Sequence, residues 1–140
     1  MRIILVMAFC AASCFGGSGF VAPGAADLES YRLVTLSSAH FVAGARELSA
    51  GEKVALEGLA KRFCHTDQTV VELRGYADGG GSVARDIALS TERARAVEKF
   101  LIERGVPAER IVLLGLGEVD PSGPALRAEH QRVDVRVFAQ

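Results

Sequence analysis

The pattern of apolar and polar residues divides this chain into stretches typical of strands and stretches typical of helices. Four stretches are rich in β-branched and other apolar residues, which is typical of strands: residues 32–38, 69–73, 111–114 and 132–138. The last of them alternates cleanly between valine and polar side chains, as a strand with one buried face does. The pattern therefore predicts four strands.

Two stretches between these strands carry apolar residues at helical spacing instead. The first follows Ser49 and Glu52, which form a Ser-x-x-Glu capping box, and it ends near Cys64. The second covers residues 90–104, and Gly105 after it is suited to a left-handed C-terminal cap. We therefore predict two main helices.

The predicted order is strand, helix, strand, helix, strand, strand, with a short helical turn at residues 125–131 before the last strand. A right-handed crossover between parallel strands places its helix on one face of the sheet. The order therefore predicts an α/β two-layer sandwich of the α+β type, in which a mixed sheet carries both helices on one face.

The N-terminal segment has the pattern of an export signal. A charged start at Arg2 precedes ten apolar residues, 3–12, whereas a membrane-spanning helix needs about 20. The residues before Cys14 are small and resemble a bacterial lipobox, which implies a signal peptide at 1–13 and a lipid anchor on Cys14. Ordinary cleavage after Ala26 is the alternative, and both interpretations stay open.

These boundaries divide the chain into three parts. Residues 14–28 are rich in glycine, alanine and serine and are predicted to be a flexible leader, and residues 29–140 form the single folded domain. Lysine and arginine number 16 against 17 acidic residues, so the chain lacks the basic excess of a nucleic-acid binder. We predict no nucleic-acid partner.

Metal and cofactor chemistry has little support in the sequence. Cys64 and His65 are adjacent, but no second pair follows at the spacing of zinc ligands. Cys64 is predicted to pack as a small apolar side chain at a helix end. We predict neither a metal site nor a cofactor.

The stretch 75–97 holds the candidate site, because it runs from a strand end through a glycine-rich loop into the second helix. Asp78 lies in the loop beside Gly81, and Arg93 is predicted in the first turn of the helix. A carboxylate and a guanidinium held together can bind a zwitterion, the first through its ammonium and the second through its carboxylate. The alternative is a turn acid and a solvated helix charge.

Two other kinds of site fit less well. The loop lacks the GxxxxGK[ST] arrangement of a phosphate site. Asp78, Asp86 and Glu92 would suffice for acid–base chemistry, but no histidine, serine or cysteine lies in a nucleophile motif. We predict that the protein is not an enzyme.

The stretch also carries a family resemblance. Its motifs are similar, in order, to those of the OmpA-like peptidoglycan-binding domain, which read G-H-T-D-x-x-G, N-x-x-L-S-x-x-R-A-x-x-V, G-x-G-E-x-x-P and N-R-R-V. Arg93 follows Asp78 by 15 positions, as in that pattern. The matching positions include Gly75, Asp78, Gly81, Leu89, Ser90, Arg93, Ala94, Val97, Gly115, Gly117, Glu118, Pro121, Arg132 and Val133.

The resemblance implies non-covalent binding of the diaminopimelate in the peptidoglycan stem peptide. Asp78 would accept from its ammonium group and Arg93 would bind its carboxylate, with Gly81 and Asp86 completing the ligand-binding loop. It also implies a periplasmic domain, similar to the Pal lipoproteins, that anchors the outer membrane to the wall. A Tol-like envelope protein is a possible further partner.

The chain departs from the family pattern at several positions. Tyr76 and Ala77 replace the His-Thr pair, Gln131 replaces the first arginine of N-R-R-V, and Asp86 replaces an asparagine. An ionised carboxylate can only accept, so Asp86 would repel a ligand carboxylate if it lined the pocket, or it could lie outside the pocket as a turn acid. The alternative function is therefore a protein–protein interaction module with weakened or lost peptidoglycan binding.

Overall fold

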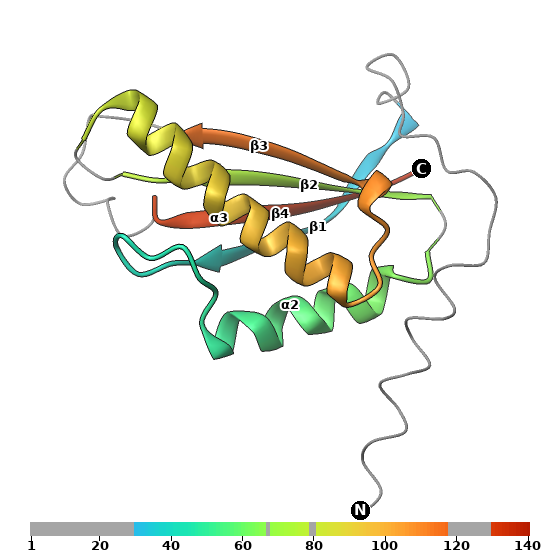
Figure 1. Ribbon diagram of the computed structural model, residues 1–140. Helices are drawn as coiled ribbons and strands as arrows, with labels where there is room; N and C mark the ends of the chain where they lie inside the picture. Colours follow the sequence, from blue (N-terminus) through green and yellow to red (C-terminus); the bar gives the residue numbers. More distant parts are fainter. Residues whose placement is uncertain (1–29, 67, 79–80, 118–129) are drawn as a thin grey trace, which may run out of the picture.

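The computed structural model of the protein describes residues 30–66, 68–78, 81–117 and 130–140. Within these residues, four strands and two α-helices follow one another in the predicted order, with a short 3-10 helix before the third strand (Figure 1). The elements are β1 (Arg32–His40), α2 (Ala50–Phe63), β2 (Thr69–Tyr76), α3 (Val83–Glu103), η2 (Ala108–Arg110), β3 (Ile111–Gly117) and β4 (Arg132–Ala139).

The strands form one mixed sheet in the order β1-β4-β2-β3. β2 and β3 are parallel, and β4 is antiparallel to both β1 and β2. Val135 of β4 therefore lies between Ser37 of β1 and Leu73 of β2. Both helices cover the same face of this sheet (Figure 1). The predicted α/β two-layer sandwich is confirmed.

The core lies between the helices and this face of the sheet. Alternation along β4 turns Val133, Val135 and Val137 toward the helices, and all three are fully buried. Leu56 of α2 and Leu101 of α3 meet them from the other layer. Each such side chain stabilises the fold by about 1.5–3 kcal/mol relative to an exposed position.

α3 packs directly on the backbone of the sheet, because two strand positions are glycine. A Cβ atom on Gly75 of β2 would lie 2.1 Å from the carbonyl oxygen of Ser90. A Cβ atom on Gly115 of β3 would lie 2.0 Å from the hydroxyl oxygen of Thr91. Neither position can carry a side chain unless α3 moves away.

The helix ends largely follow the sequence signals. The hydroxyl of Ser49 accepts from the backbone N–H of Glu52 at 3.3 Å, as an N-cap does. At the end of α3 the N–H of Gly105 donates to Ile102, and that of Val106 donates to Leu101. Gly105 has a φ of 94°, so these bonds form the predicted left-handed cap. Cys64 is buried at the end of α2, as predicted.

The predicted start of α3 was wrong. The helix begins at Val83 rather than near residue 90, and the hydroxyl of Ser82 caps it by accepting from the N–H of Arg85. Arg93 therefore lies in the third turn and not in the first. Among residues 83–89, which the structure adds to the predicted helix, the buried side chain is the polar Asp86, so hydrophobic periodicity does not show this part of α3. The helical turn predicted at 125–131 falls mainly outside the described residues.

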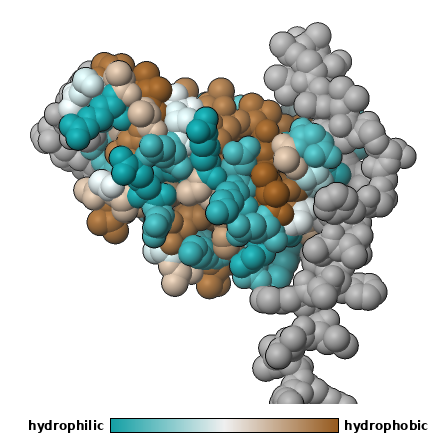
Figure 2. Space-filling model, in the orientation of Figure 1, coloured by the Kyte–Doolittle hydropathy of each residue, from teal (hydrophilic) through white to brown (hydrophobic). Residues whose placement is uncertain are grey.

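The outer surfaces are mainly polar. Figure 2 shows hydrophilic side chains over much of the helical face, with separate hydrophobic patches between them. On the opposite face of the sheet, Glu72 accepts from Arg74 at 2.5 Å and from Arg136 at 3.0 Å. Among the described residues, no helix combines the length and the apolar character that a membrane span requires.

Candidate ligand-binding site

A pocket of about 420 Å³ opens where the end of β2, the start of α3 and the β1–α2 connection meet. A volume of this size is in the range of small-molecule sites. It is lined by Ala43, Gly44, Arg46, Asp78, Arg85, Asp86, Ala88, Leu89 and Glu92. Two of the predicted site residues, Asp78 and Asp86, thus share one pocket.

Asp78 is the second residue after β2, and hydrogen bonds fix the backbone around it. The N–H of Ala77 donates to the carbonyl of Gly117 at 3.1 Å. The carbonyl of Asp78 itself accepts from the side-chain amide of Gln131 at 2.5 Å. These bonds hold Asp78, which is half-buried, at the pocket wall.

Asp86 lies in the first turn of α3 and is 3% exposed. A carboxylate is favoured there, because the N-terminus of a helix carries partial positive charge. Asp86 is among the residues that line the pocket, and its predicted part in ligand binding stays a prediction. An ionised Asp86 presents only acceptors to whatever enters.

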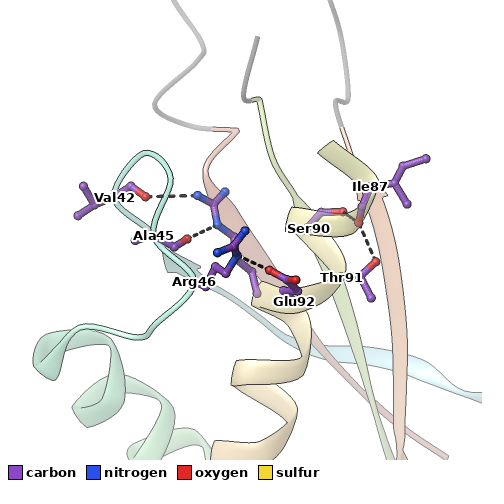
Figure 3. Close-up of polar contacts among 8 residues, drawn as sticks. Val42, Ala45, Arg46, Ile87, Ser90, Thr91 and Glu92 are labelled. Atoms are coloured by element: carbon purple, nitrogen blue, oxygen red, sulfur yellow. Dashed lines mark hydrogen bonds and ion pairs between the residues drawn. The ribbon is translucent and has the colours of Figure 1, made fainter. Parts of the chain in front are cut away.

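Arg93 lies behind the pocket, and its side chain is completely buried. Its Nε donates to the carbonyl of Ala45 at 2.8 Å, and its Nη2 donates to the carbonyl of Val42 at 3.3 Å (Figure 3). These two hydrogen bonds attach the β1–α2 connection to α3. Nη1 donates to the carbonyl of Tyr76 at 3.3 Å and to Oε1 of Gln131 at 2.5 Å.

The charge of Arg93 is enclosed by these acceptors and by an aromatic ring. The guanidinium carbon lies 5.2 Å from the centre of the Phe41 ring, a distance that allows cation–π attraction. Burial lowers the pKa of the Arg93 guanidinium, and the nearby charge of Arg46 lowers that pKa further. The group still stays protonated, because an arginine side chain does not lose its proton in a protein.

Arg46 is the guanidinium that reaches the pocket from the β1–α2 connection. Its Nε forms an ion pair with the carboxylate of Glu92 on α3 (Figure 3). The side chains of Arg46 and Glu92 are 67% and 49% exposed, so solvent screens the pair. Arg85, on the first turn of α3, supplies a second guanidinium to the lining.

Gly81 and Cys14 complete the predicted residues. Gly81 comes directly before the cap residue Ser82 and is exposed, and it is not among the pocket-lining residues. A Cβ atom there would lie 3.3 Å from Cδ of Arg85. Cys14 lies outside the described residues. In the described part of the chain, no cluster of three or more His, Cys, Asp or Glu side chains could hold a metal ion.

The sequence model of the OmpA family matches residues 40–133, which is more than half of the chain. The chain belongs to the OmpA family. The matched range contains the pocket, and it extends from the end of β1 into the beginning of β4. The resemblance seen in the sequence motifs is thereby confirmed.

Curated relatives in this family are longer proteins. The chain is 39% identical over 71 residues to the peptidoglycan-binding protein ArfA of Mycobacterium tuberculosis, a match that covers 48% of this chain and 22% of ArfA. It is 46% identical over 55 residues to outer membrane protein A of Escherichia coli O157:H7, covering 39% of this chain and 16% of that protein. The chain thus spans about a fifth of these relatives.

Solved structures share the fold of this OmpA-family domain. The peptidoglycan-associated lipoprotein from Burkholderia pseudomallei superposes with a TM-score of 0.66 at 23% identity, covering 71% of this chain and 88% of that one. The periplasmic domain of Helicobacter pylori MotB gives a TM-score of 0.61 at 19% identity, covering 75% of each chain. At these identities the likeness establishes the fold alone.

Sequence reasoning missed three polar residues of the site, Arg46, Arg85 and Gln131. Arg46 lies in a connection without regular structure, and only the packing of that connection against α3 brings it to the pocket. Gln131 joins Asp78 to Arg93, because its amide donates to one and accepts from the other. The usable signal was its departure from the family pattern, since an arginine at position 131 could not accept from Arg93.

Proposed function

We propose that this domain binds peptidoglycan without cleaving it, by holding the diaminopimelate of a stem peptide in the pocket beside Asp78. The observation that carries the proposal is the pocket itself, where two acids, Asp78 and Asp86, face the same space as a guanidinium from the β1–α2 connection. The end of a diaminopimelate side chain is a zwitterion, and this arrangement offers an acceptor for its ammonium and a donor for its carboxylate.

In this proposal Asp78 accepts from the ammonium group, and Asp86 adds negative charge on the same side. The predicted contact between Arg93 and the ligand carboxylate stays a prediction. Because Arg93 is fully buried, its bonds to the carbonyls of Val42 and Ala45 support an indirect role in which it shapes the pocket wall. Glycine at position 81 avoids a close contact with the side chain of Arg85, since a Cβ atom there would lie 3.3 Å from its Cδ.

The family relationship supports the same ligand. ArfA is named as a peptidoglycan-binding protein, and its match to this chain is 39% identical over 71 residues. Binding needs no nucleophile and no metal, and the pocket as described offers acceptors and guanidinium donors. We therefore propose a binding function and no bond-breaking chemistry.

A pull-down on purified sacculi of the diaminopimelate type tests the proposal. We expect the wild-type protein to be retained, and Asp78→Asn to bind about tenfold more weakly, since a charged hydrogen bond contributes about 1.5–3 kcal/mol. Glu109→Gln is the matched control, because it removes one negative charge from an exposed position on η2.

The pull-down has two outcomes that would reject the proposal. Equal retention of the wild type and Asp78→Asn would mean that the pocket is not the binding site. No retention of the wild type would favour a protein–protein interaction module, for which the acid at position 86 is the supporting feature. Crosslinking in cells would then identify a protein partner, such as a Tol-like envelope protein.

We also propose that the domain works in the periplasm and that a lipid on Cys14 tethers it to the outer membrane. The support is the small-residue sequence before Cys14 and the apolar run that precedes it. Mass spectrometry of the mature N-terminus tests this: an acylated cysteine is expected, and an unmodified start at Asp27 would reject the anchor.

A further inference from the structure

We propose that this domain forms a symmetric dimer in which the free edge of β3 pairs with the same edge of a second copy of the chain. The two β3 strands run antiparallel about a two-fold axis and join the two sheets into one continuous sheet. The dimer surface is separate from the pocket, since neither Val112 nor Leu114, which lie at its centre, lines the pocket.

β3 is an edge strand with little protection against pairing. It lies at one end of the strand order, and in the described part of the chain only β2 pairs with it (Figure 1). The outer N–H and C=O groups of an edge strand are a template for a further strand, and proteins usually protect such an edge with charged residues, proline or a bulge. β3 reads Ile-Val-Leu-Leu-Gly-Leu-Gly, without a charged residue or a proline. Its outer edge is therefore open to another strand.

The other edge strand, β1, has the protection that β3 lacks. It begins with the charged Arg32, and its register with β4 shifts between Leu33 and Thr35. Such a shift bends the strand and disturbs regular pairing. The register of β3 with β2 shifts only after Gly115, so residues 111–115 form a regular strand. Of the two edges, β3 is the one suited to pairing.

Large apolar side chains accompany the free edge of β3 on both faces of the sheet. Five of them are each between 38% and 43% exposed: Val112, Leu114 and Leu116 of β3, and Ile87 and Ile102 of α3. Val112 and Leu114 lie beside Glu72 and Arg74 of β2, on the face opposite the helices. Exposed apolar side chains along a free strand edge are typical of an interaction site.

The regular part of β3 is complementary to itself, which favours a second copy as the partner. In an antiparallel pair centred on Leu113, Val112 of each copy lies opposite Leu114 of the other, and apolar pairs of this kind stabilise a sheet. On the other face, Ile111 lies opposite Gly115, which has no side chain to collide with it. A two-fold contact places the same patch of both copies together, and this strand satisfies that condition.

The course of α3 over β3 shows which part of the helix lies near this axis. A Cβ atom on Gly115 would contact Thr91, and one on Gly117 would lie 3.0 Å from Cγ1 of Ile87. Two residues along β3 therefore correspond to four residues along α3 in the opposite direction, as the rise per residue of a strand and a helix requires. Leu113 accordingly lies below the helix turn that follows Thr91.

The same axis also matches two exposed residues of α3. The turn over Leu113 is centred near position 95, and Ile87 and Ile102 lie eight positions before and seven positions after it. Both lie on the side of α3 that carries Thr91, because they are one turn and three turns from it. An axis through Leu113 therefore brings Ile87 of one copy beside Ile102 of the other.

The spacing of the two helices is also suitable. α3 contacts the backbone of both β2 and β3, at Gly75 and Gly115, so its axis lies between these strands. With strands about 4.8 Å apart, the two α3 helices of the dimer lie about 10 Å apart, which is a normal distance for packed helices. One two-fold axis therefore serves the strand contact and the helix contact together.

Sedimentation velocity on the purified full chain tests the proposal. A mild detergent is added so that the apolar residues 3–12 do not themselves cause association. The contact of one strand and one helix side is at the small end of specific interfaces, so we expect a dissociation constant of about 10 µM. Leu114→Glu should raise it at least about 30-fold, because the carboxylate would be buried against Val112 of the other copy.

Leu36→Glu on β1 is the matched control. Leu114 lies beside Arg74 of the neighbouring strand, and Leu36 lies beside Arg136 in the same way, so both variants place a carboxylate next to an arginine. We expect Leu36→Glu to dimerise as the wild type does. Circular dichroism on each variant confirms that it is folded.

A second pair of variants tests the position of the axis. Ile102→Glu on α3 should weaken the dimer about tenfold, because it places a charge beside Ile87 of the other copy. Val54→Glu, at an exposed apolar position on α2, should leave the dissociation constant unchanged. If Ile102→Glu dimerises as the wild type does, the axis through Leu113 is wrong.

Three results would overturn the dimer as a whole. These are a wild type that stays monomeric up to about 500 µM, fifty times the expected dissociation constant, a Leu114→Glu variant that dimerises unchanged, and equal weakening by Leu114→Glu and Leu36→Glu. Retention on sacculi is measured separately, so the loss of this dimer would leave the proposed binding function standing.

Discussion

The two helices lie on the same face of the sheet, but they bury different kinds of side chain. α2 buries Leu56, Leu59 and Ala60, all apolar. α3 buries polar groups as well, and these are Asp86, Ser90 and Arg93. The polar groups lie in its first three turns, and its last turns bury only apolar residues. α2 therefore acts as a cover for the core, and α3 combines that role with support of the site.

Hydrogen bonds explain why α3 tolerates polar groups in the interior. The hydroxyl of Ser90 donates to the carbonyl of Ile87 at 2.8 Å and accepts from the N–H of Gly117 at 3.0 Å. Thr91 donates to the same carbonyl at 2.7 Å (Figure 3). A buried polar group with its partners in place costs little, while one that loses a partner is strongly destabilising. Substitutions on α3 should therefore be less tolerated than equivalent ones on α2.

The largest difference should come from glycine. Gly75→Ala places a methyl group 2.1 Å from the carbonyl oxygen of Ser90, so α3 must separate from β2. We expect a loss of about 4 kcal/mol in the free energy of unfolding, at the upper end for single substitutions. Urea denaturation followed by circular dichroism measures it.

Gly58→Ala on α2 is the matched control. Gly58 is exposed inside the helix, and a Cβ atom there has nothing within 4 Å. Alanine should stabilise the helix by about 0.5–1 kcal/mol, because glycine loses more conformational freedom on folding. A similar loss of stability in both variants would contradict the close packing of α3 on the sheet.

Arg93→Met should have the second-largest effect. Methionine fills a similar volume but leaves the carbonyls of Ala45, Val42 and Tyr76 without their donor. We expect a loss of about 2–3 kcal/mol in the free energy of unfolding. We also expect weaker binding of a synthetic stem peptide that contains diaminopimelate, because the β1–α2 connection loses its hydrogen bonds to Arg93. Denaturation and calorimetric titration measure the two effects.

Arg95→Met, on the exposed side of the same helix, is the control for that substitution. It should change the free energy of unfolding by less than about 0.5 kcal/mol, as surface substitutions usually do. If Arg93→Met lowered the free energy of unfolding as little as Arg95→Met, the hydrogen bonds donated by Arg93 would have no role in stability.

The same contrast between the helices explains what the sequence could predict. α2 and the end of α3 have local signals, namely a capping box, an apolar stripe and a glycine cap, and their predicted features agree with the structure. The start of α3 was missed because its buried stripe continues through Asp86, Ser90 and Arg93. These residues keep the helical spacing, but they are polar and carry no hydrophobic signal.

The candidate site shows the same limit. Asp78 and Asp86 were found because both lie in one stretch of chain with a glycine-rich loop. Arg46 and Gln131 lie 32 positions before Asp78 and 53 positions after it. They reach the site only through the packing of the β1–α2 connection and of the start of β4, and no local pattern encodes that proximity.

The smallest expected effect compares the two helix caps. Ser49 on α2 and Ser82 on α3 each accept from a backbone N–H in the first turn at 3.3 Å. Replacing either with alanine should lower the free energy of unfolding by about 1 kcal/mol. By stability alone the two variants should therefore look alike.

Ligand binding should separate them. Ser82 begins the helix whose first turn carries Arg85 and Asp86 into the pocket, so fraying of that turn displaces part of the lining. We expect Ser82→Ala to weaken the diaminopimelate peptide about threefold, a change of less than 1 kcal/mol in binding free energy, and Ser49→Ala to leave it unchanged. Equal weakening by both would mean that the peptide responds to overall stability and that the start of α3 has no special part in binding.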